Sequence, residues 1–200
     1  RKDTLVDLVW PPIVTAWCVM AALALGAVPL IRWRADKSSR TSDAVALNLD
    51  EDVGFVKDLV QRVSSFTGHA WDAWEAPVVT RYQPGAVFAR HGDASPTKGS
   101  EWSDAGGQRV VTCICYLNTV KEGGETFFDQ IEDIAIKPRQ GMALVFFPAH
   151  EDTLEADGRT THEARAPVQQ EKWIVQLFGR IGPRVPPPLG LPDSAATFFQ

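Results

Sequence analysis

The chain has 200 residues, which suits a single domain with enough length to bury a hydrophobic core. Its net charge of −5 and its pI of about 5.4 argue against general nucleic-acid binding, which needs a basic surface.

The chain has three cysteines, so they cannot all pair within it: Cys18, Cys113 and Cys115. We interpret Cys113 and Cys115 as small buried residues of one strand, with a Cys-x-Cys metal site as a minor alternative, and the cysteine count does not fix the compartment.

The N-terminal part contains a long apolar segment. From Ile13 to Ile31 no residue is charged, and this length just spans a bilayer as a helix. We therefore interpret residues 1–35 as an apolar N-terminal segment and a candidate membrane anchor. The basic residues that follow it place the rest of the chain on the cytoplasmic side in that case. The alternatives are a buried helix of the soluble domain, or sequence that does not belong to the mature protein.

A helix is predicted next, over residues 50–66. Its apolar residues fall near one stripe at the helical period: Val53, Val56, Val60 and Val63. The helix is expected to end near Thr67-Gly68, because glycine suits the residue that follows a helix.

Short apolar stretches separated by turn residues follow the helix, a pattern typical of a β-sandwich or barrel. The expected strands cover residues 77–82, 87–91, 110–117, 126–128, 134–137, 142–147 and 172–180. The polar segment Ser95–Gln108 predicts a long loop, which is either a lid or plain surface. Residues 182–200 are rich in proline and are expected to extend away from the core.

The triplet His91-Gly92-Asp93, together with His162, is the strongest candidate for a site. Side chains at i and i+2 of a strand share a face, so His91 and Asp93 can bind one metal ion together if the stretch is extended. Two imidazoles and one carboxylate are the ligands of non-haem Fe(II) oxygenases, and they leave coordination positions open. An isolated His-x-Asp is also common by chance. His150 is the alternative third ligand, but it stands in a charged loop, so we favour His162.

Lys172 lies in an apolar strand context, beside Trp173 and Ile174. If its side chain points inward, the buried ammonium needs an anion as its partner, because an uncompensated charge is costly to bury. The alternative is an outward lysine on an edge strand.

Seven sequence blocks stand in a consistent order and spacing: Arg40-Thr41-Ser42, Tyr82–His91, Arg109–Asn118, Glu122–Thr126, Pro138–Gly141, Leu144–Phe147 and Glu171–Trp173. In this order they resemble the catalytic domain of the prolyl 4-hydroxylases, which are 2-oxoglutarate and Fe(II)-dependent dioxygenases. The resemblance implies a mainly β, α+β chain with N-terminal helices and a double-stranded β-helix, or jelly-roll, core. The oxygenase domain is then expected over residues 40–181.

The resemblance also implies roles for individual residues. His91, Asp93 and His162 are expected to hold Fe(II) as the catalytic centre. Lys172 and Tyr82 are expected to bind the distal carboxylate of 2-oxoglutarate, and Thr112 to line the same pocket. The implied co-substrates are 2-oxoglutarate and O2, with ascorbate as a family expectation.

The implied reaction is hydroxylation of peptidyl proline at C4, with release of succinate and CO2. The expected partner is a proline-containing peptide or protein, with membrane association through residues 13–31. Two alternatives are the same chemistry on another residue or small molecule, and a non-catalytic jelly-roll binding module. Many members of this family act in the secretory lumen behind an N-terminal anchor, so the endoplasmic reticulum or another secretory membrane is the expected location, with the cytoplasm as the alternative.

Overall fold

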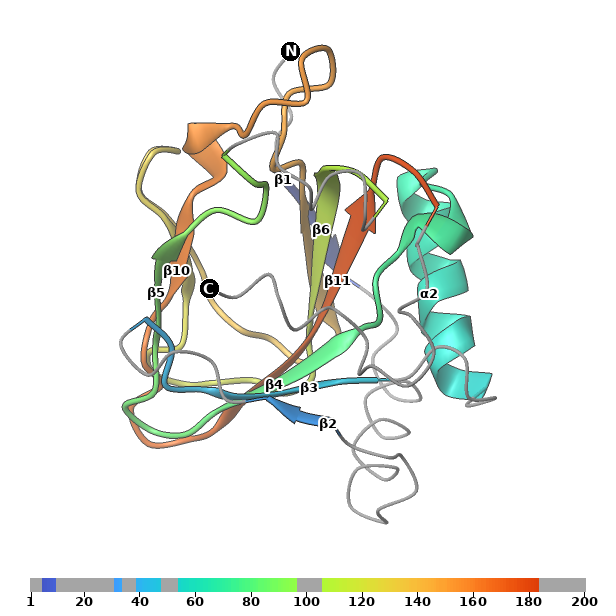
Figure 1. The fold of residues 1–200 in the computed structure, drawn as a ribbon. Coiled ribbons are helices and arrows are strands. Elements are labelled where there is room, and N and C mark those ends of the chain that lie inside the picture. Colours follow the sequence, from blue (N-terminus) through green and yellow to red (C-terminus); the bar gives the residue numbers. More distant parts are fainter. Residues whose placement is uncertain (1–4, 10–30, 34–38, 48–53, 97–105, 184–200) are drawn as a thin grey trace.

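The computed structural model describes residues 5–9, 31–33, 39–47, 54–96 and 106–183 (Figure 1). Most of the uncharged segment 13–31, the centre of the predicted loop 95–108 and the proline-rich tail from residue 184 lie outside these ranges. In the described part, no helix combines the length and the apolar character that a bilayer crossing needs.

Two antiparallel sheets form the body of the structure (Figure 1). The strands of the seven-stranded sheet, in spatial order, are β1 (Leu5–Val9), β9 (Met142–Phe146), β6 (Arg109–Tyr116), β11 (Lys172–Arg180), β4 (Val78–Tyr82), β3 (Asp43–Ala46) and β2 (Ile31–Trp33). Those of the four-stranded sheet are β5 (Phe88–His91), β10 (His162–Ala164), β7 (Thr126–Phe128) and β8 (Ile134–Ile136). Two short 3-10 helices, Trp71–Ala73 and Gly158–Thr160, lie in connections.

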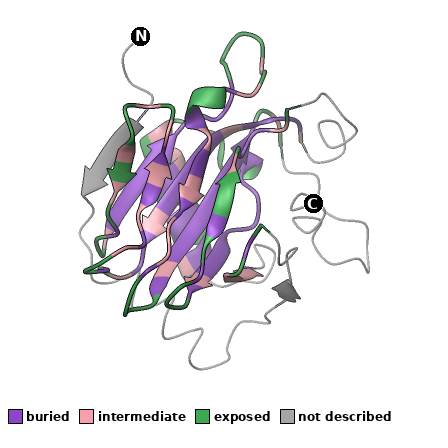
Figure 2. Ribbon diagram, turned by 90° about the vertical axis from the view of Figure 1, so that its left-hand side faces the viewer, coloured by how far each residue is buried: buried purple, intermediate pink, exposed green. Residues whose placement is uncertain are grey.

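The space between the sheets holds one of the two main apolar clusters. The large sheet contributes residues such as Ile114 and Phe146, and the small sheet contributes Phe88, Phe128 and Ala164. Figure 2 shows the buried residues along the strands and the exposed ones in the connecting loops. This two-sheet arrangement confirms the mainly β part of the predicted fold class and is consistent with a jelly-roll.

The helix α2 (Gly54–Thr67) covers the outer face of the large sheet (Figure 1). Val56, Leu59, Val60 and Val63 are buried against residues of β6, β9 and β11, as the predicted apolar stripe requires. The helix ends where the sequence indicates, since Gly68 adopts a φ of +70°. It is the one α-helix among the described residues, so the plural N-terminal helices of the prediction are not shown.

The strand predictions agree with the structure to within about two residues, whereas four of the described strands were not anticipated: β10, which carries His162, and three strands of the large sheet. Asp43–Ala46 belongs to the large sheet and pairs with β4. Leu5–Val9 pairs with β9, and Ile31–Trp33 pairs with β3. These strands are short and lack a regular apolar alternation, so their pairing partners rather than their own sequences determine them.

Strand β11 lies near the centre of the large sheet, between β6 and β4. Val175 and Leu177 pack into the cluster under α2, while Ile174 packs into the cluster between the sheets. Because side chains alternate along a strand, Lys172 shares its face with Ile174 and points into the space between the sheets. An inward lysine was one of the two alternatives for this position.

Candidate metal and co-substrate site

His91 and His162 lie next to each other on two adjacent strands of the small sheet. His91 is the last residue of β5, His162 is the first residue of β10, and the two are direct partners in the antiparallel register. Asp93 follows the end of β5 by two residues. One ligand atom from each of the three side chains lies within 4.8 Å of the other two, and His91 Nε2 is 3.7 Å from Asp93 Oδ1. The structure therefore brings together the three predicted metal ligands.

Backbone carbonyls fix the orientation of both imidazoles. The Nδ1 of His91 lies 2.7 Å from the carbonyl oxygen of Ala89, and the Nδ1 of His162 lies 3.0 Å from that of Thr160. With Nδ1–H as the donor in each ring, Nε2 keeps its lone pair for a metal. His91 Nε2 is buried and has no hydrogen-bond partner among the described residues. An imidazole nitrogen that is buried, unpaired and next to a carboxylate is suited to a metal ion.

Aromatic rings pack against both imidazoles. The ring of Phe88 stacks on His91 at a centroid distance of 3.7 Å. The rings of Phe128 and Phe146 lie against His162 at centroid distances of 5.2 and 5.1 Å. Burial, and then the neighbouring His162, lower the pKa of His91 to about 4. His91 is thus neutral at neutral pH, the form in which an imidazole binds a metal.

Asp93 is buried, and its carboxylate is held by Thr112, whose hydroxyl donates to Oδ2 at 2.8 Å. Burial by itself raises the pKa of Asp93, but His162, His91 and Arg109 outweigh it, and the pKa lies below the ordinary value. Asp93 is therefore ionised at neutral pH. The role of Thr112 in the co-substrate pocket remains a prediction, and its bond to Asp93 is a finding that the sequence did not indicate.

A buried ion-pair network lies next to Asp93. Glu75 accepts hydrogen bonds from Arg109 at 2.7 and 2.7 Å, and its Oε1 also lies 2.8 Å from Nε of Arg180. Arg109 lowers the pKa of Asp93 through its charge. Glu75 is far from the other members in sequence, so its contribution could not be read from any motif.

Lys172 is completely buried, and its Nζ has no hydrogen-bond partner among the described residues. The nitrogen lies 4.9 Å from the ring centre of Tyr82 and 5.8 Å from that of Tyr116. Desolvation lowers the pKa of Lys172 to about 7, although Glu125 opposes the shift. A buried lysine with aromatic rings around it and no hydrogen-bond partner among the described residues is a ready site for an anion, which fits a carboxylate of 2-oxoglutarate.

Tyr82 is the register partner of Lys172 on the adjacent strand β4. It is buried, and desolvation raises the pKa of its phenol, with Arg40 opposing the shift. Arg40 is also buried: it donates to Ser42 at 2.7 Å and to Thr80 at 3.0 Å. The Arg-Thr-Ser block that supported the family resemblance thus lies beside Tyr82, which the sequence did not predict.

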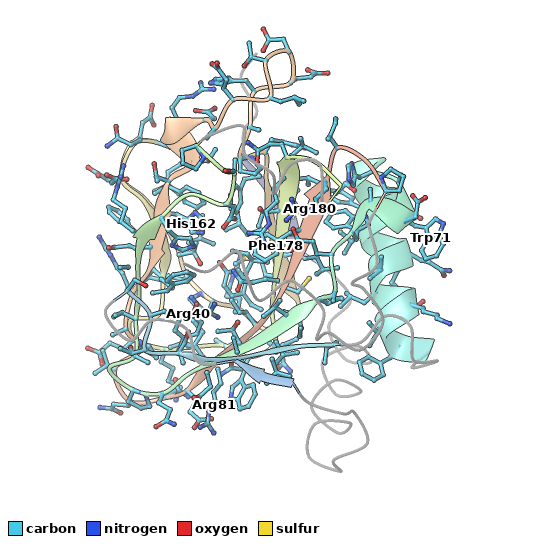
Figure 3. The ribbon with its side chains drawn as sticks, in the orientation of Figure 1. Arg40, Trp71, Arg81, His162, Phe178 and Arg180 are labelled. Carbon is cyan, nitrogen blue, oxygen red and sulfur yellow. The ribbon has the colours of Figure 1, made fainter. Side chains whose placement is uncertain are left out.

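Figure 3 shows His162, Phe178, Arg180 and Arg40 directed into the space between the sheets, whereas Trp71 and Arg81 are directed away from it. His150, the alternative third ligand, is exposed and is not part of the ligand cluster. It lines a separate cavity of about 560 Å³, together with Thr67 at the end of α2 and with Ile181.

A mainly β sandwich with two imidazoles, a carboxylate and an unpaired cation between its sheets defines a candidate mononuclear metal centre with an adjoining anion site. The family model of the 2OG-Fe(II) oxygenase superfamily matches residues 77–180, and the chain belongs to this superfamily. Its members use Fe(II), 2-oxoglutarate and O2, and the donor set and the unpaired ammonium fit these groups.

Curated relatives and solved structures agree with this family. Prolyl 4-hydroxylase 2 of Arabidopsis thaliana is 29% identical over 154 residues, which cover 67% of this chain and 50% of the relative. Prolyl 4-hydroxylase 13 of the same plant is 27% identical over 145 residues, covering 66% of this chain and 52% of the relative. The chain thus spans about half the length of such curated relatives.

Among solved structures, the 2OG complex of a viral collagen prolyl hydroxylase from Paramecium Bursaria Chlorella virus-1 matches with a TM-score of 0.69 and 21% identity, over 88% of this chain and 96% of the other. A prolyl hydroxylase from Trichoplax adhaerens, in complex with a hypoxia inducible factor peptide, matches with a TM-score of 0.67 and 18% identity, over 90% and 84%. At these identities, the likeness shows the fold.

The His162→Ala variant is expected to bind Fe(II) more than about 100-fold more weakly than the parent, because loss of an outer partner of a ligand alone costs 10–100-fold. The matched His150→Ala variant should bind as the parent does, since His150 is exposed and outside the cluster. Anaerobic titration calorimetry measures both. Equal affinities for His162→Ala and the parent would contradict the ligand assignment.

The Lys172→Met variant is expected to be more stable than the parent in the absence of 2-oxoglutarate. The pKa of Lys172 falls from 10.5 to about 7 on folding, which corresponds to at most about 5 kcal/mol. The unfolded chain binds more protons between these values, so the stability of the parent rises with pH through this window. The gain from methionine should therefore be full below pH 7 and should shrink towards pH 10.5.

Urea unfolding at pH 6 and pH 9 measures this difference, with Lys137→Met as the control at an exposed lysine. The same Lys172→Met variant should bind 2-oxoglutarate roughly 10- to 100-fold more weakly, the usual effect of losing a charged hydrogen bond. A variant that is destabilised at pH 6 and still binds 2-oxoglutarate like the parent would show that Lys172 is not the anion site.

Proposed function

We propose that this chain hydroxylates peptidyl proline at C4, using Fe(II), 2-oxoglutarate and O2 and releasing succinate and CO2. The observation that carries the proposal is the pairing of a His91–Asp93–His162 ligand cluster with the buried, unpaired ammonium of Lys172 between the same two sheets. A binding module that had lost its chemistry would have no need to bury an uncompensated charge beside three convergent ligands.

The side chains have distinct tasks in this proposal. His91, Asp93 and His162 hold Fe(II), which supplies the oxygen chemistry when it is bound. Thr112 orients the carboxylate of Asp93, and the carbonyls of Ala89 and Thr160 orient the imidazoles.

Two further groups serve the co-substrate. Lys172 and Tyr82 bind the distal carboxylate of 2-oxoglutarate. Binding of this carboxylate places an anion in direct contact with Lys172, so the Lys172 pKa rises and the ammonium form persists at neutral pH. Phe88, Phe128 and Phe146 pack against the imidazoles and hold them in place.

Proline as the substrate is supported by the names of the relatives and by the peptide complex of the Trichoplax adhaerens enzyme. We propose ascorbate as the reductant that restores Fe(II) after unproductive turnover.

A secretory membrane is the proposed location, on the strength of the uncharged segment 13–31 alone. The same chemistry on another residue or a small molecule is the second candidate, because the superfamily match defines the centre and not the substrate.

The test is succinate formation by the purified chain, loaded with Fe(II) without oxygen and then exposed to air, with and without a panel of proline-containing peptides. Proline peptides should stimulate succinate formation and should gain one oxygen atom, found as 4-hydroxyproline after hydrolysis. The His91→Ala chain is the control for oxidation by free iron. Succinate formation that no proline peptide stimulates would reject proline as the substrate and favour the second candidate.

A further inference from the structure

Arg40 is a buried cation that reaches into the space between the sheets from a short segment beside β5 (Figure 3). The backbone holds this segment in place, because Ala89 N donates to the carbonyl of Ser39 at 2.7 Å and Arg40 forms an isolated antiparallel bridge with Phe88. The guanidinium also lies over the ring of Phe88, 4.7 Å from its centre. The position of the guanidinium is therefore defined by contacts on both its backbone and its side chain.

The guanidinium of Arg40 donates to two hydroxyl groups. Its Nε donates to Ser42 Oγ at 2.7 Å, and its Nη2 donates to Thr80 Oγ1 at 3.0 Å. A guanidinium has only donors, so both hydroxyl oxygens must accept from it, and each hydroxyl keeps one proton for a further acceptor. Thr80 gives its proton to Oε1 of Gln176 at 3.3 Å. Arg40 thus sets the direction of the hydrogen bonds that lead away from it.

Ser42 is also hydrogen-bonded to Tyr82. Among the described residues, the Ser42 hydroxyl bonds Arg40 and Tyr82, so the proton that Ser42 keeps goes to the phenol oxygen of Tyr82. Desolvation raises the pKa of Tyr82, while the charge of Arg40 and the hydrogen bond with Ser42 oppose this shift. A hydrogen bond lowers the pKa of a phenol when the phenol oxygen accepts it, which agrees with Ser42 as the donor.

The Tyr82 hydroxyl accepts from Ser42 and therefore keeps its own proton for another group. Tyr82 is the register partner of Lys172, whose Nζ lies 4.9 Å from the centre of the Tyr82 ring. An ammonium has donors and no acceptor, so Lys172 in its charged form does not take this proton. The two side chains then present only donors to a bound group. An ionised carboxylate, which has only acceptors, is the end group that such a site fits.

We propose that Arg40 and Ser42 are positioning residues for the co-substrate: they turn the Tyr82 hydroxyl so that it donates to the distal carboxylate of 2-oxoglutarate. The inference rests on the proposed function, in which Tyr82 and Lys172 bind that carboxylate. It adds two residues that act through Tyr82 rather than by contact with the co-substrate. The first donor of the chain is charged, and each hydrogen bond polarises the next, so the chain strengthens the last bond, from Tyr82 to the carboxylate.

The test is a double-mutant cycle on the affinity for 2-oxoglutarate, measured by titration calorimetry of the full chain loaded with Fe(II) in the absence of oxygen. Ser42→Ala removes the donor to Tyr82 and should weaken binding about 3- to 10-fold, the usual effect of one hydrogen bond. The same substitution in a Tyr82→Phe chain should cause no further loss, because the hydroxyl that Ser42 orients is already absent. Ser42→Thr keeps a hydroxyl and should bind like the parent.

Thr41→Ala is the matched control at the neighbouring hydroxyl. This hydroxyl accepts from the amide nitrogen of Val87 at 2.9 Å, so it supports the same segment without bonding Tyr82. The Thr41→Ala chain should bind 2-oxoglutarate like the parent. The Ser42→Ala chain should keep the Fe(II) affinity of the parent, which separates a loss at the co-substrate site from a loss of the metal.

Arg40→Met tests the first donor of the chain. Without Arg40, Ser42 is free to accept from Tyr82 instead of donating to it, so binding should weaken at least as much as in Ser42→Ala. Adding Ser42→Ala to Arg40→Met should cause no further loss. If the two losses multiply instead, Arg40 does not act through Ser42. If Arg40→Met does not fold, the cycle of Ser42 with Tyr82 decides the inference.

Two results overturn the inference: a Ser42→Ala chain that binds 2-oxoglutarate like the parent, or a loss that is as large in the Tyr82→Phe chain as in the parent. Either result leaves the proposed function standing. The binding measurements need no peptide, so a parent chain that binds 2-oxoglutarate but hydroxylates no proline peptide rejects the proposed reaction and not the positioning role. A parent chain that does not bind 2-oxoglutarate rejects both.

Discussion

The antiparallel pairing of β5 with β10 is the constraint on which the site depends. It sets His91 directly opposite His162, although 70 residues separate them in sequence. A shift of the register by one residue would send one of the two imidazoles to the other face of the sheet. The pairing is supported on one side by the aromatic residues between the sheets and on the other by β7, which pairs with β10.

Buried charge is the second determinant of the site. Some of the buried charged groups are ion-paired within the protein, and Lys172 is not. Glu75 is matched by Arg109 and Arg180, so that network is satisfied within the protein and helps to keep Asp93 ionised. Lys172 lacks such a partner among the described residues, and its stability cost is consistent with a group kept for binding. Glu75 is therefore a structural charge of this interior, whereas Lys172 is the candidate for a functional charge.

The sequence predicted seven of the described strands and the three residues that cluster as candidate metal ligands, because apolar stretches between turn residues and the order of the motif blocks can be read from the chain itself. It could not decide whether Lys172 points inward, since that depends on which face of β11 packs against the small sheet. His91 and Asp93 were expected on one strand, yet β5 ends at His91 and Thr112 of another strand holds Asp93. Arg40 and Glu75 were missed as parts of the interior because only the folded chain brings them there.

The central claim is that the space between the two sheets holds a metal ion and, next to it, the distal carboxylate of a co-substrate. The most direct measurement is a crystal structure grown without oxygen in the presence of iron and 2-oxoglutarate, with the iron located by its anomalous scattering. We predict iron bound by Nε2 of His91, Nε2 of His162 and the carboxylate of Asp93, with the distal carboxylate of 2-oxoglutarate hydrogen-bonded to Nζ of Lys172. Iron bound by other side chains, or 2-oxoglutarate oriented away from Lys172, would contradict it.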